Sequence, residues 1–347
     1  MKRIFEIDKN FRVETSVARE DAVFYDPRKE PFAICGVFYD GRRFRRIPQN
    51  AAKATNDGVA FLHSNTAGGR VRFKTDSPYI VINAKMSGVD QMPHFPLTGS
   101  AGFDLYADGR YERSFVPDAA MRKGYESEAW LGGNQMREIT IHMPLYANVD
   151  SLCIGLAGGA AVLPAEPYEN VPPVVYYGSS ITQGGCASRP GNAYENMLSR
   201  MLNVDHINLG FSGSARGEEA ITNYIAGLEM SVFVLDYDHN APDVQHLKNT
   251  HEKLFLAVRK AHPELPVVML SRPKYRLDED EQARRETVKQ TYENALAAGD
   301  KNVYFLDGPA LMALAGDDGT VDNCHPNDLG FYSMAKALEP VLREILK

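Results

Sequence analysis

The chain has 347 residues, which is long enough for two medium-sized domains that each bury a core. Its hydrophobic and charged fractions, 44% and 24%, are those of globular proteins, so the whole chain is expected to fold. A formal net charge of −7, with Lys and Arg scattered along the chain, argues against binding to nucleic acid.

Membrane association and secretion are not expected either. The sequence contains no run of the about 20 apolar residues that a membrane helix needs. The basic start at residues 1–3 meets acidic residues before any apolar run, so it predicts neither a signal peptide nor an anchor. The four cysteines lie far apart and without a Cys-x-x-Cys pair, which indicates reduced thiols: Cys35, Cys153, Cys186 and Cys324. We therefore expect a cytoplasmic location.

Residues 1–168 are predicted to form a β-sandwich, jelly-roll-like domain. Short runs of alternating polar and apolar residues occur at 70–74, 79–84 and 138–143. Turn-forming residues separate these runs, and many short strands at such spacing are typical of a sandwich. The Pro-containing segment 170–173 resembles a linker, so we place the domain boundary near residue 168.

Residues 169–347 are predicted to form a three-layer α/β/α domain. Strands are expected at 174–177, 207–209, 232–235, 267–270 and 303–306. Helices are expected between and after them, at about 194–201, 218–226, 244–261, 279–298 and 329–346. Nearly continuous apolar strands that alternate with helices indicate a parallel sheet of about five strands, covered on both faces. Ligands bind at the carboxyl ends of such strands.

Polar residues follow these strands where a site would assemble. Ser180 is the candidate nucleophile and His325 its base, and Asp322, three residues earlier, can orient the imidazole. The backbone amides of Ser180 and Gly213 and the side-chain amide of Asn240 are the candidate oxyanion donors. Activity would then require neutral His325, with an apparent pKa of about 6 to 7.5.

Each assignment has an alternative. Ser180 can be a helix N-cap, and Ser179 can be the nucleophile if the motif is shifted by one residue. Cys324 is a second candidate nucleophile, although adjacent side chains rarely point at each other. Asp317 and Asp318 compete with Asp322 as partners of the base, and Asn240 can simply cap a loop.

No metal or cofactor is expected. The histidines of the first half lack the spacing of metal ligands: His63, His94 and His142. His239 can line a pocket or lie in a solvated loop. Arg216 and Glu218 can contact substrate or form a surface ion pair, and Trp130 can be a core residue or lie over a sugar.

The segments 178–184, 210–214, 236–241 and 322–326 resemble, in this order, the four blocks of the SGNH (GDSL) hydrolase superfamily. The resemblance covers about residues 172–347 and implies the same catalytic and oxyanion residues as above. Two departures stand out. Ser179 replaces the usual Asp of the first block, and Asn240 is not followed by the usual Asp. The string Gly-Ser-Ser-Ile-Thr-Gln-Gly resembles the carbohydrate-deacetylating branches.

The first half carries a second resemblance. Residues 102–106, Gly-Phe-Asp-Leu-Tyr, are similar to the Gly-x-Asp-Leu-Tyr signature of a β domain that precedes SGNH hydrolases, and the resemblance covers roughly residues 15–165. Leu105 is expected in the core, and Asp104 is expected to be a turn or bridging residue.

The predicted function is that of a cofactor-free serine esterase that removes an acyl group, above all acetyl, from a carbohydrate or another polar alcohol. The partner is a small-molecule or oligosaccharide ester, and homo-oligomerisation is left open. A thioesterase or lysophospholipase is the nearest enzymatic alternative. A carbohydrate-binding protein with a vestigial hydrolase fold is the alternative from another class. Because the linker is short and Pro-rich, the sandwich is expected to help shape the pocket.

Overall fold

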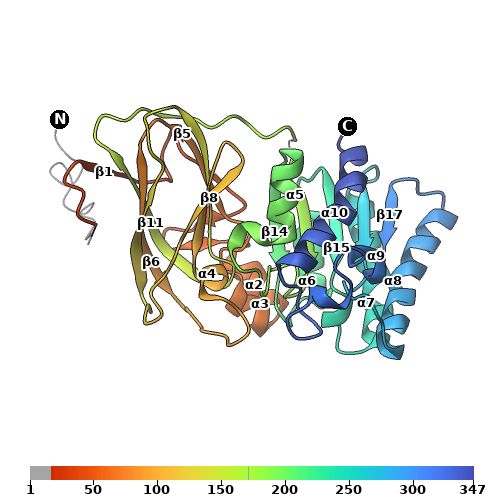
Figure 1. Ribbon diagram of the computed structural model, residues 1–347. Helices are drawn as coiled ribbons and strands as arrows, with labels where there is room; N and C mark the ends of the chain where they lie inside the picture. Colours follow the sequence, from red (N-terminus) through yellow and green to blue (C-terminus); the bar gives the residue numbers. More distant parts are fainter. Residues whose placement is uncertain (1–16, 171) are drawn as a thin grey trace.

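A computed structural model describes residues 17–170 and 172–347, and Figure 1 shows a β-rich part followed by an α/β part. The basic chain start interpreted above, and Val171 of the linker, lie outside the described residues. Within the described ranges, no helix is long and apolar enough to cross a membrane.

The first part consists of two antiparallel sheets. One has the order β1-β11-β6-β9, with bounds Ala22–Tyr25, Asn148–Ala157, Tyr79–Ser87 and Gly124–Trp130. The other has the order β12-β5-β10-β7-β8, with bounds Val162–Leu163, Arg70–Thr75, Arg137–His142, Phe103–Ala107 and Arg110–Phe115. In addition, β2 (Ala33–Cys35) pairs with β5, and β3 (Phe38–Tyr39) pairs with β4 (Phe44–Arg45).

The core of this part lies between the two sheets, as the alternation of the strands predicted. Ile82 and Ile154 from the first sheet share one buried cluster with Phe73, Leu105 and Ile141 from the second. The sequence pattern did not reveal the short helices of this half: α2 (Gln49–Thr55), α3 (Asp57–Leu62) and α4 (Leu97–Ser100).

The second part has a five-stranded parallel sheet with the order β14-β13-β15-β16-β17. The strand bounds, in that order, are His206–Gly210, Val174–Gly178, Val232–Asp236, Val267–Leu270 and Val303–Leu306. The helices are α5 (Tyr194–Leu202), α6 (Glu219–Ala226), α7 (Val244–Ala261), α8 (Glu279–Ala297), α9 (Gly308–Leu311) and α10 (Asp328–Ile345). Three short 3₁₀ helices complete it: η2 (Pro190–Asn192), η3 (Asp238–Asn240) and η4 (Gly316–Gly319).

Helices cover both faces of this sheet (Figure 1). One buried cluster contains Leu247 of α7 and Val288 of α8, and the other contains Leu198 of α5 and Leu338 of α10. The predicted sandwich followed by a three-layer α/β/α domain is thus confirmed. Chain order reverses at β13, which lies between β14 and β15, and this reversal is where ligands bind in such sheets.

The two parts pack against each other along buried surface. Ala52, Val59 and Leu62 of α2 and α3 belong to the same apolar cluster as Ile221 of α6, so helices of the first half complete the core of the second. The boundary near residue 168 stays a prediction, and this residue lies between β12 and β13.

Two arginines of the first part are buried in the surface between the parts. Arg46, 2% exposed, donates to the backbone oxygen of Leu62 at 2.8 Å and also to that of Gly210, at the end of β14. Arg70, 0% exposed, pairs with Asp205 and donates to the backbone oxygen of His206 at 3.1 Å. Buried guanidinium groups are costly unless their donors are used, and here both parts supply acceptors.

Candidate active site

Ser180 lies directly after β13 and is 6% exposed. Its Oγ is 3.0 Å from Nε2 of His325. The neighbouring Ser179 is fully buried, and its Oγ accepts a hydrogen bond from the backbone N–H of Ile181 at 3.0 Å. The two hydroxyls therefore differ in role: one faces an imidazole and the other stabilises the turn. This difference favours Ser180 over Ser179 as the nucleophile.

His325 and Asp322 belong to one short loop. Nδ1 of His325 lies 2.8 Å from Oδ2 of Asp322, and Oδ1 of Asp322 accepts the backbone N–H of His325 at 2.7 Å. The competing acids lie elsewhere: Asp317 pairs with Arg276 at 2.6 Å. With its proton on Nδ1, His325 donates to Asp322 and leaves Nε2 free to accept the proton of Ser180.

The loop favours the charged form of the imidazole. Burial alone would raise the pKa of Asp322, but hydrogen bonds from the His325 backbone, the His325 ring and the Cys324 backbone lower it to about 2. Contact with the Cys324 thiol, and then with Asp322, outweighs burial and raises the pKa of His325 to about 9. This value is above the range expected from the sequence, because the thiol contact was not foreseen.

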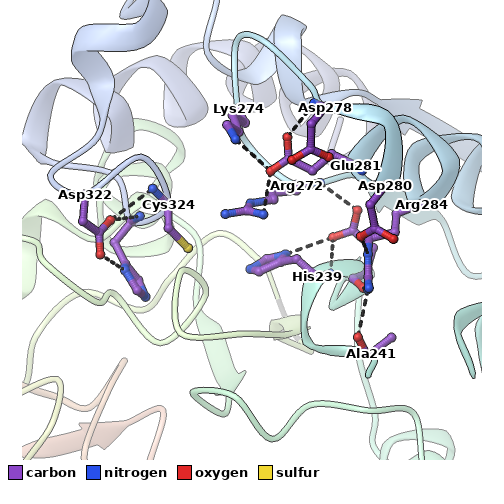
Figure 2. Close-up of polar contacts among 12 residues, drawn as sticks. His239, Ala241, Arg272, Lys274, Asp278, Asp280, Glu281, Arg284, Asp322 and Cys324 are labelled. Atoms are coloured by element: carbon purple, nitrogen blue, oxygen red, sulfur yellow. Dashed lines mark hydrogen bonds and ion pairs between the residues drawn. The ribbon is translucent and has the colours of Figure 1, made fainter. Parts of the chain in front are cut away.

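Cys324 contacts the ring of the residue that follows it. Its Sγ and the ligand atoms of Asp322 and His325 lie within 4.8 Å of one another, and Figure 2 shows Cys324 beside Asp322. Burial raises the pKa of the Cys324 thiol, but contact with His325 outweighs burial and lowers it. The expectation that adjacent side chains point apart was wrong here. Asn323, between them and Asp322, has a φ of 64°, which bends the loop.

The candidate oxyanion residues carry polar atoms that make no hydrogen bond in the described part of the chain. Within the described residues, neither the backbone N–H of Ser180 nor that of Gly213 donates a hydrogen bond. The side-chain oxygen of Asn240 is buried and has no hydrogen-bond partner in this part of the chain. Gly213 has a φ of 64° with open space around its Cα, so glycine is needed for the backbone conformation and not for packing.

A polar network fixes the turn that carries Asn240, as Figure 2 shows. Arg284 of α8 donates to the backbone oxygens of Asp238 and Ala241, at 2.8 Å each. Nδ1 of His239 lies 2.9 Å from Oδ1 of Asp238, whose other oxygen accepts the backbone N–H of Arg272 at 3.0 Å. The His239 side chain is mostly buried within this network, which corrects its alternative as a solvated loop residue.

Residues 172–343 match the GDSL-like Lipase/Acylhydrolase family, and residues 22–162 match the family described as the N-terminus of Esterase_SGNH_hydro-type. The chain belongs to the SGNH (GDSL) hydrolase superfamily. Its first domain is of the GxDLY type, as the sequence indicated, and membership makes it a carboxylic ester hydrolase. No curated protein matches the chain.

Several solved structures are similar over most of this chain, including both domains. A putative GDSL-like lipase from Bacteroides ovatus ATCC 8483 is 28% identical, with a TM-score of 0.84 over 94% of this chain and 98% of that one. The salicylyl-acyltransferase SsfX3 from a tetracycline biosynthetic pathway is 19% identical, with a TM-score of 0.76 over the same shares. A family two carbohydrate esterase from Clostridium thermocellum is 15% identical, with a TM-score of 0.64 over 90% and 98%. The likeness of this chain to the last two structures shows a shared fold and nothing more.

In this SGNH hydrolase the GxDLY domain reaches the Ser180 region. The hydroxyl of Tyr146 donates to the backbone oxygen of Ser180 at 3.2 Å, and the ring of His94 lies 5.9 Å from that of His325. Tyr146 also lines a cavity of about 290 Å³, whose lining includes neither Ser180 nor His325. Its lining comes from both domains and includes Phe61, Asn65, Asp90, Met92, Ser212 and Ser214. Sequence reasoning missed Tyr146 and this role of His94, because no local pattern reports a contact between distant segments.

Groups that could hold a metal ion occur in the same region. Three sets of residues place ligand atoms within 4.8 Å of one another: His94, Cys186 and His325; Asp322, Cys324 and His325; and Asp236, Asp238 and His239. Two of the sets use His325, whose ring nitrogens already face Ser180 and Asp322. A metal there would compete with the serine for the imidazole.

Proposed function

We propose that the chain is a serine esterase in which Ser180 is the nucleophile, His325 the general base and Asp322 the residue that orients it. The observation that carries the proposal is the continuous contact from Ser180 Oγ to His325 Nε2, at 3.0 Å, and from His325 Nδ1 to Asp322 Oδ2, at 2.8 Å. A serine hydroxyl needs such a base to attack an ester at neutral pH.

The reaction runs in two halves. Ser180 Oγ attacks the ester carbonyl while its proton passes to Nε2 of His325, and the imidazolium is stabilised by Asp322. The oxyanion accepts from the free N–H groups of Ser180 and Gly213 and from the Asn240 side-chain amide. The C–O bond to the alcohol then breaks, and the alcohol leaves with the proton from His325. Water, deprotonated by His325, cleaves the acyl-serine and regenerates the hydroxyl.

The proposed substrate is an acetyl ester of a carbohydrate or a similar polar alcohol. The cavity that Tyr146 lines, about 290 Å³, is slightly smaller than typical ligand pockets of about 300 to 1,000 Å³. Its lining combines hydroxyl, amide and carboxylate groups with Phe61, which suits a small polar alcohol better than a long acyl chain. Folds of this type include family two carbohydrate esterases and an acetyl xylan esterase, which supports the same substrate class. A cytoplasmic site of action stays a prediction.

Two serine variants test the proposal. Ser180→Ala should lower the turnover of p-nitrophenyl acetate by about 10⁴ to 10⁶-fold, while the melting temperature stays close to that of the wild type. Ser179→Ala is the matched control, because it removes a neighbouring hydroxyl that bonds only to backbone. An active Ser180→Ala protein with an inactive Ser179→Ala protein would overturn the assignment. Acetylated xylo-oligosaccharides compared with long-chain p-nitrophenyl esters test the substrate class.

A further inference from the structure

The Gly-x-Asp-Leu-Tyr signature lies on β7, and its residues alternate between two environments. Leu105 points into the core of the sandwich. Asp104 and Tyr106 occupy the other face of the strand and contact the catalytic domain. Asp104 is fully buried, and its Oδ2 accepts the backbone N–H of Gly191 at 2.8 Å and the guanidinium of Arg189 at 3.0 Å. The bridging role expected for Asp104 is therefore an interdomain contact.

The segment that Asp104 holds is tightly packed. Arg189 donates to the hydroxyl of Tyr106 at 2.5 Å. A Cβ on Gly191 would lie 2.6 Å from that hydroxyl and 2.7 Å from Oδ2 of Asp104, so only glycine allows this approach. Arg200 of α5 donates to the backbone oxygen of Gly191 at 2.6 Å. A buried carboxylate is costly unless it is paired, and here each contact goes to one short segment of the other domain.

The same segment also contacts the start of α10, which follows the loop that carries His325. Ser188 donates to Asp328 twice, from its backbone N–H at 2.8 Å and from its Oγ at 2.5 Å. Asp328 is the first residue of α10 and lies three residues after His325. Thr98 of α4 donates to the backbone oxygen of Ser188 at 2.6 Å. Contacts therefore run from the sandwich, through residues 188–191, to Asp328, which the chain joins to His325 through two intervening residues.

We propose that Asp104 is a positioning residue, which holds residues 188–191 and, through Ser188 and Asp328, keeps His325 aligned with Ser180. This inference rests on the proposed function, since it takes Ser180 and His325 as the reacting pair. It gives the signature of the first domain a role in catalysis without contact with substrate. Small displacements of reacting groups lower turnover far more than they lower binding.

The structure offers a matched control on the same interface. Asp205 pairs with the buried Arg70, so this interaction is also a carboxylate and an arginine from different domains. Asp205 precedes the first residue of β14, however, whereas Ser180 lies beyond the carboxyl end of β13 in the same parallel sheet. Asp205→Ala should therefore loosen the interface without disturbing the reacting pair.

The test compares kcat and KM of Asp104→Ala and Asp205→Ala with p-nitrophenyl acetate. Asp104→Ala should lower kcat by about 10 to 100-fold and leave KM within about 3-fold. Asp205→Ala should lower the melting temperature and leave kcat within about 3-fold. Equal loss of kcat in both variants, or loss of only melting temperature in Asp104→Ala, would refute the positioning role. Failure of the proposed function shows separately, as full activity in Ser180→Ala.

Two further variants keep the test decisive if Asp104→Ala does not fold. Asp104→Asn keeps one acceptor oxygen for Gly191 and Arg189, so its kcat should be much closer to that of the wild type than the kcat of Asp104→Ala. Ser188→Ala removes the hydroxyl contacts with Asp328 and Asn192 but keeps the backbone contact with Asp328, and it should lower kcat without a change in KM. In the double variant of Asp104→Ala and Asp328→Ala, the losses should be less than multiplicative, because both residues act through one series of contacts. Independent losses would contradict this series.

Discussion

The contact between Cys324 and His325 makes a prediction that the sequence alone did not. If the thiol raises the pKa of the base, then Cys324→Ala should lower that pKa while Asp322 still orients the ring. The variant removes a side chain that has no part in the proposed reaction. Activity near neutral pH should therefore rise, which is an unusual result for a substitution beside a catalytic residue.

The sign and size follow from protonation of His325. The base must be neutral, so activity increases as pH rises through its pKa, which is raised from 6.5 to about 9. That difference corresponds to about 3 kcal/mol in favour of the imidazolium, and leaves about 1% of the base neutral at pH 7. Complete removal of this pKa shift would increase the neutral fraction of His325 at pH 7 by about 80-fold. The gain in Cys324→Ala should be smaller, because the Asp322 contact remains. Above about pH 10 the gain should vanish.

The assay is the pH dependence of kcat/KM between pH 5 and about 10.5, with p-nitrophenyl acetate corrected for its own hydrolysis. Cys153→Ala is a control, because this thiol is on β11 of the sandwich, outside the catalytic domain. In the wild type, kcat/KM should rise with an apparent pKa above 7.5. Of the two variants, only Cys324→Ala should shift this rise to lower pH.

Two outcomes would refute this reasoning. In the first, the wild-type kcat/KM rises with an apparent pKa between about 6 and 7.5, and Cys324→Ala does not change that pKa. This result would mean that the thiol does not interact with the imidazolium. Loss of all activity in Cys324→Ala, with activity retained in Ser180→Ala, would instead make the thiol the nucleophile.

The remaining predictions concern the oxyanion donors, metals and the first domain. Asn240→Ala should lower kcat by about 10² to 10³-fold with KM nearly unchanged, since the amide acts mainly on the developing charge, and a rise in KM alone would contradict this. EDTA should leave activity unchanged, and zinc-restorable loss in EDTA would contradict the metal-free reaction. A chain that starts at residue 169 should be poorly soluble or should lose selectivity for larger acetylated sugars, because Ala52, Val59 and Leu62 no longer cover the catalytic core. A soluble truncated chain with unchanged selectivity would show that the sandwich does not shape the pocket.

The sequence predicted those parts of the molecule that local patterns encode. Continuous apolar strands indicated the parallel sheet, and polar residues at the strand ends indicated Ser180, Gly213 and the loop of Asp322 and His325. The closeness of Ser180 and His325, 145 residues apart, followed only from the fold that those strands imply.

The missed features depend on contacts between distant segments or on one backbone angle. Tyr146 contacts Ser180 and His94 lies near His325, both from the other domain, and nothing in the residues around them reports it. The helices α2 and α3 follow two very short strands and pack on another domain, so their apolar residues gave no recognisable sandwich pattern. The Cys324 contact depends on the bend at Asn323, which residue types alone do not specify.

The buried position of Arg46 and Arg70 has a consequence for how the chain is made. Both belong to the domain that leaves the ribosome first, and their acceptors at Asp205, His206 and Gly210 are synthesised more than a hundred residues later. Until then the two guanidinium groups lack these acceptors and keep only those of their own domain. We therefore expect the catalytic sheet to pack against a sandwich domain that is already folded. An exchange of sandwich domains between relatives should succeed only where acceptors for both arginines are present in and next to β14, the strand before Gly213.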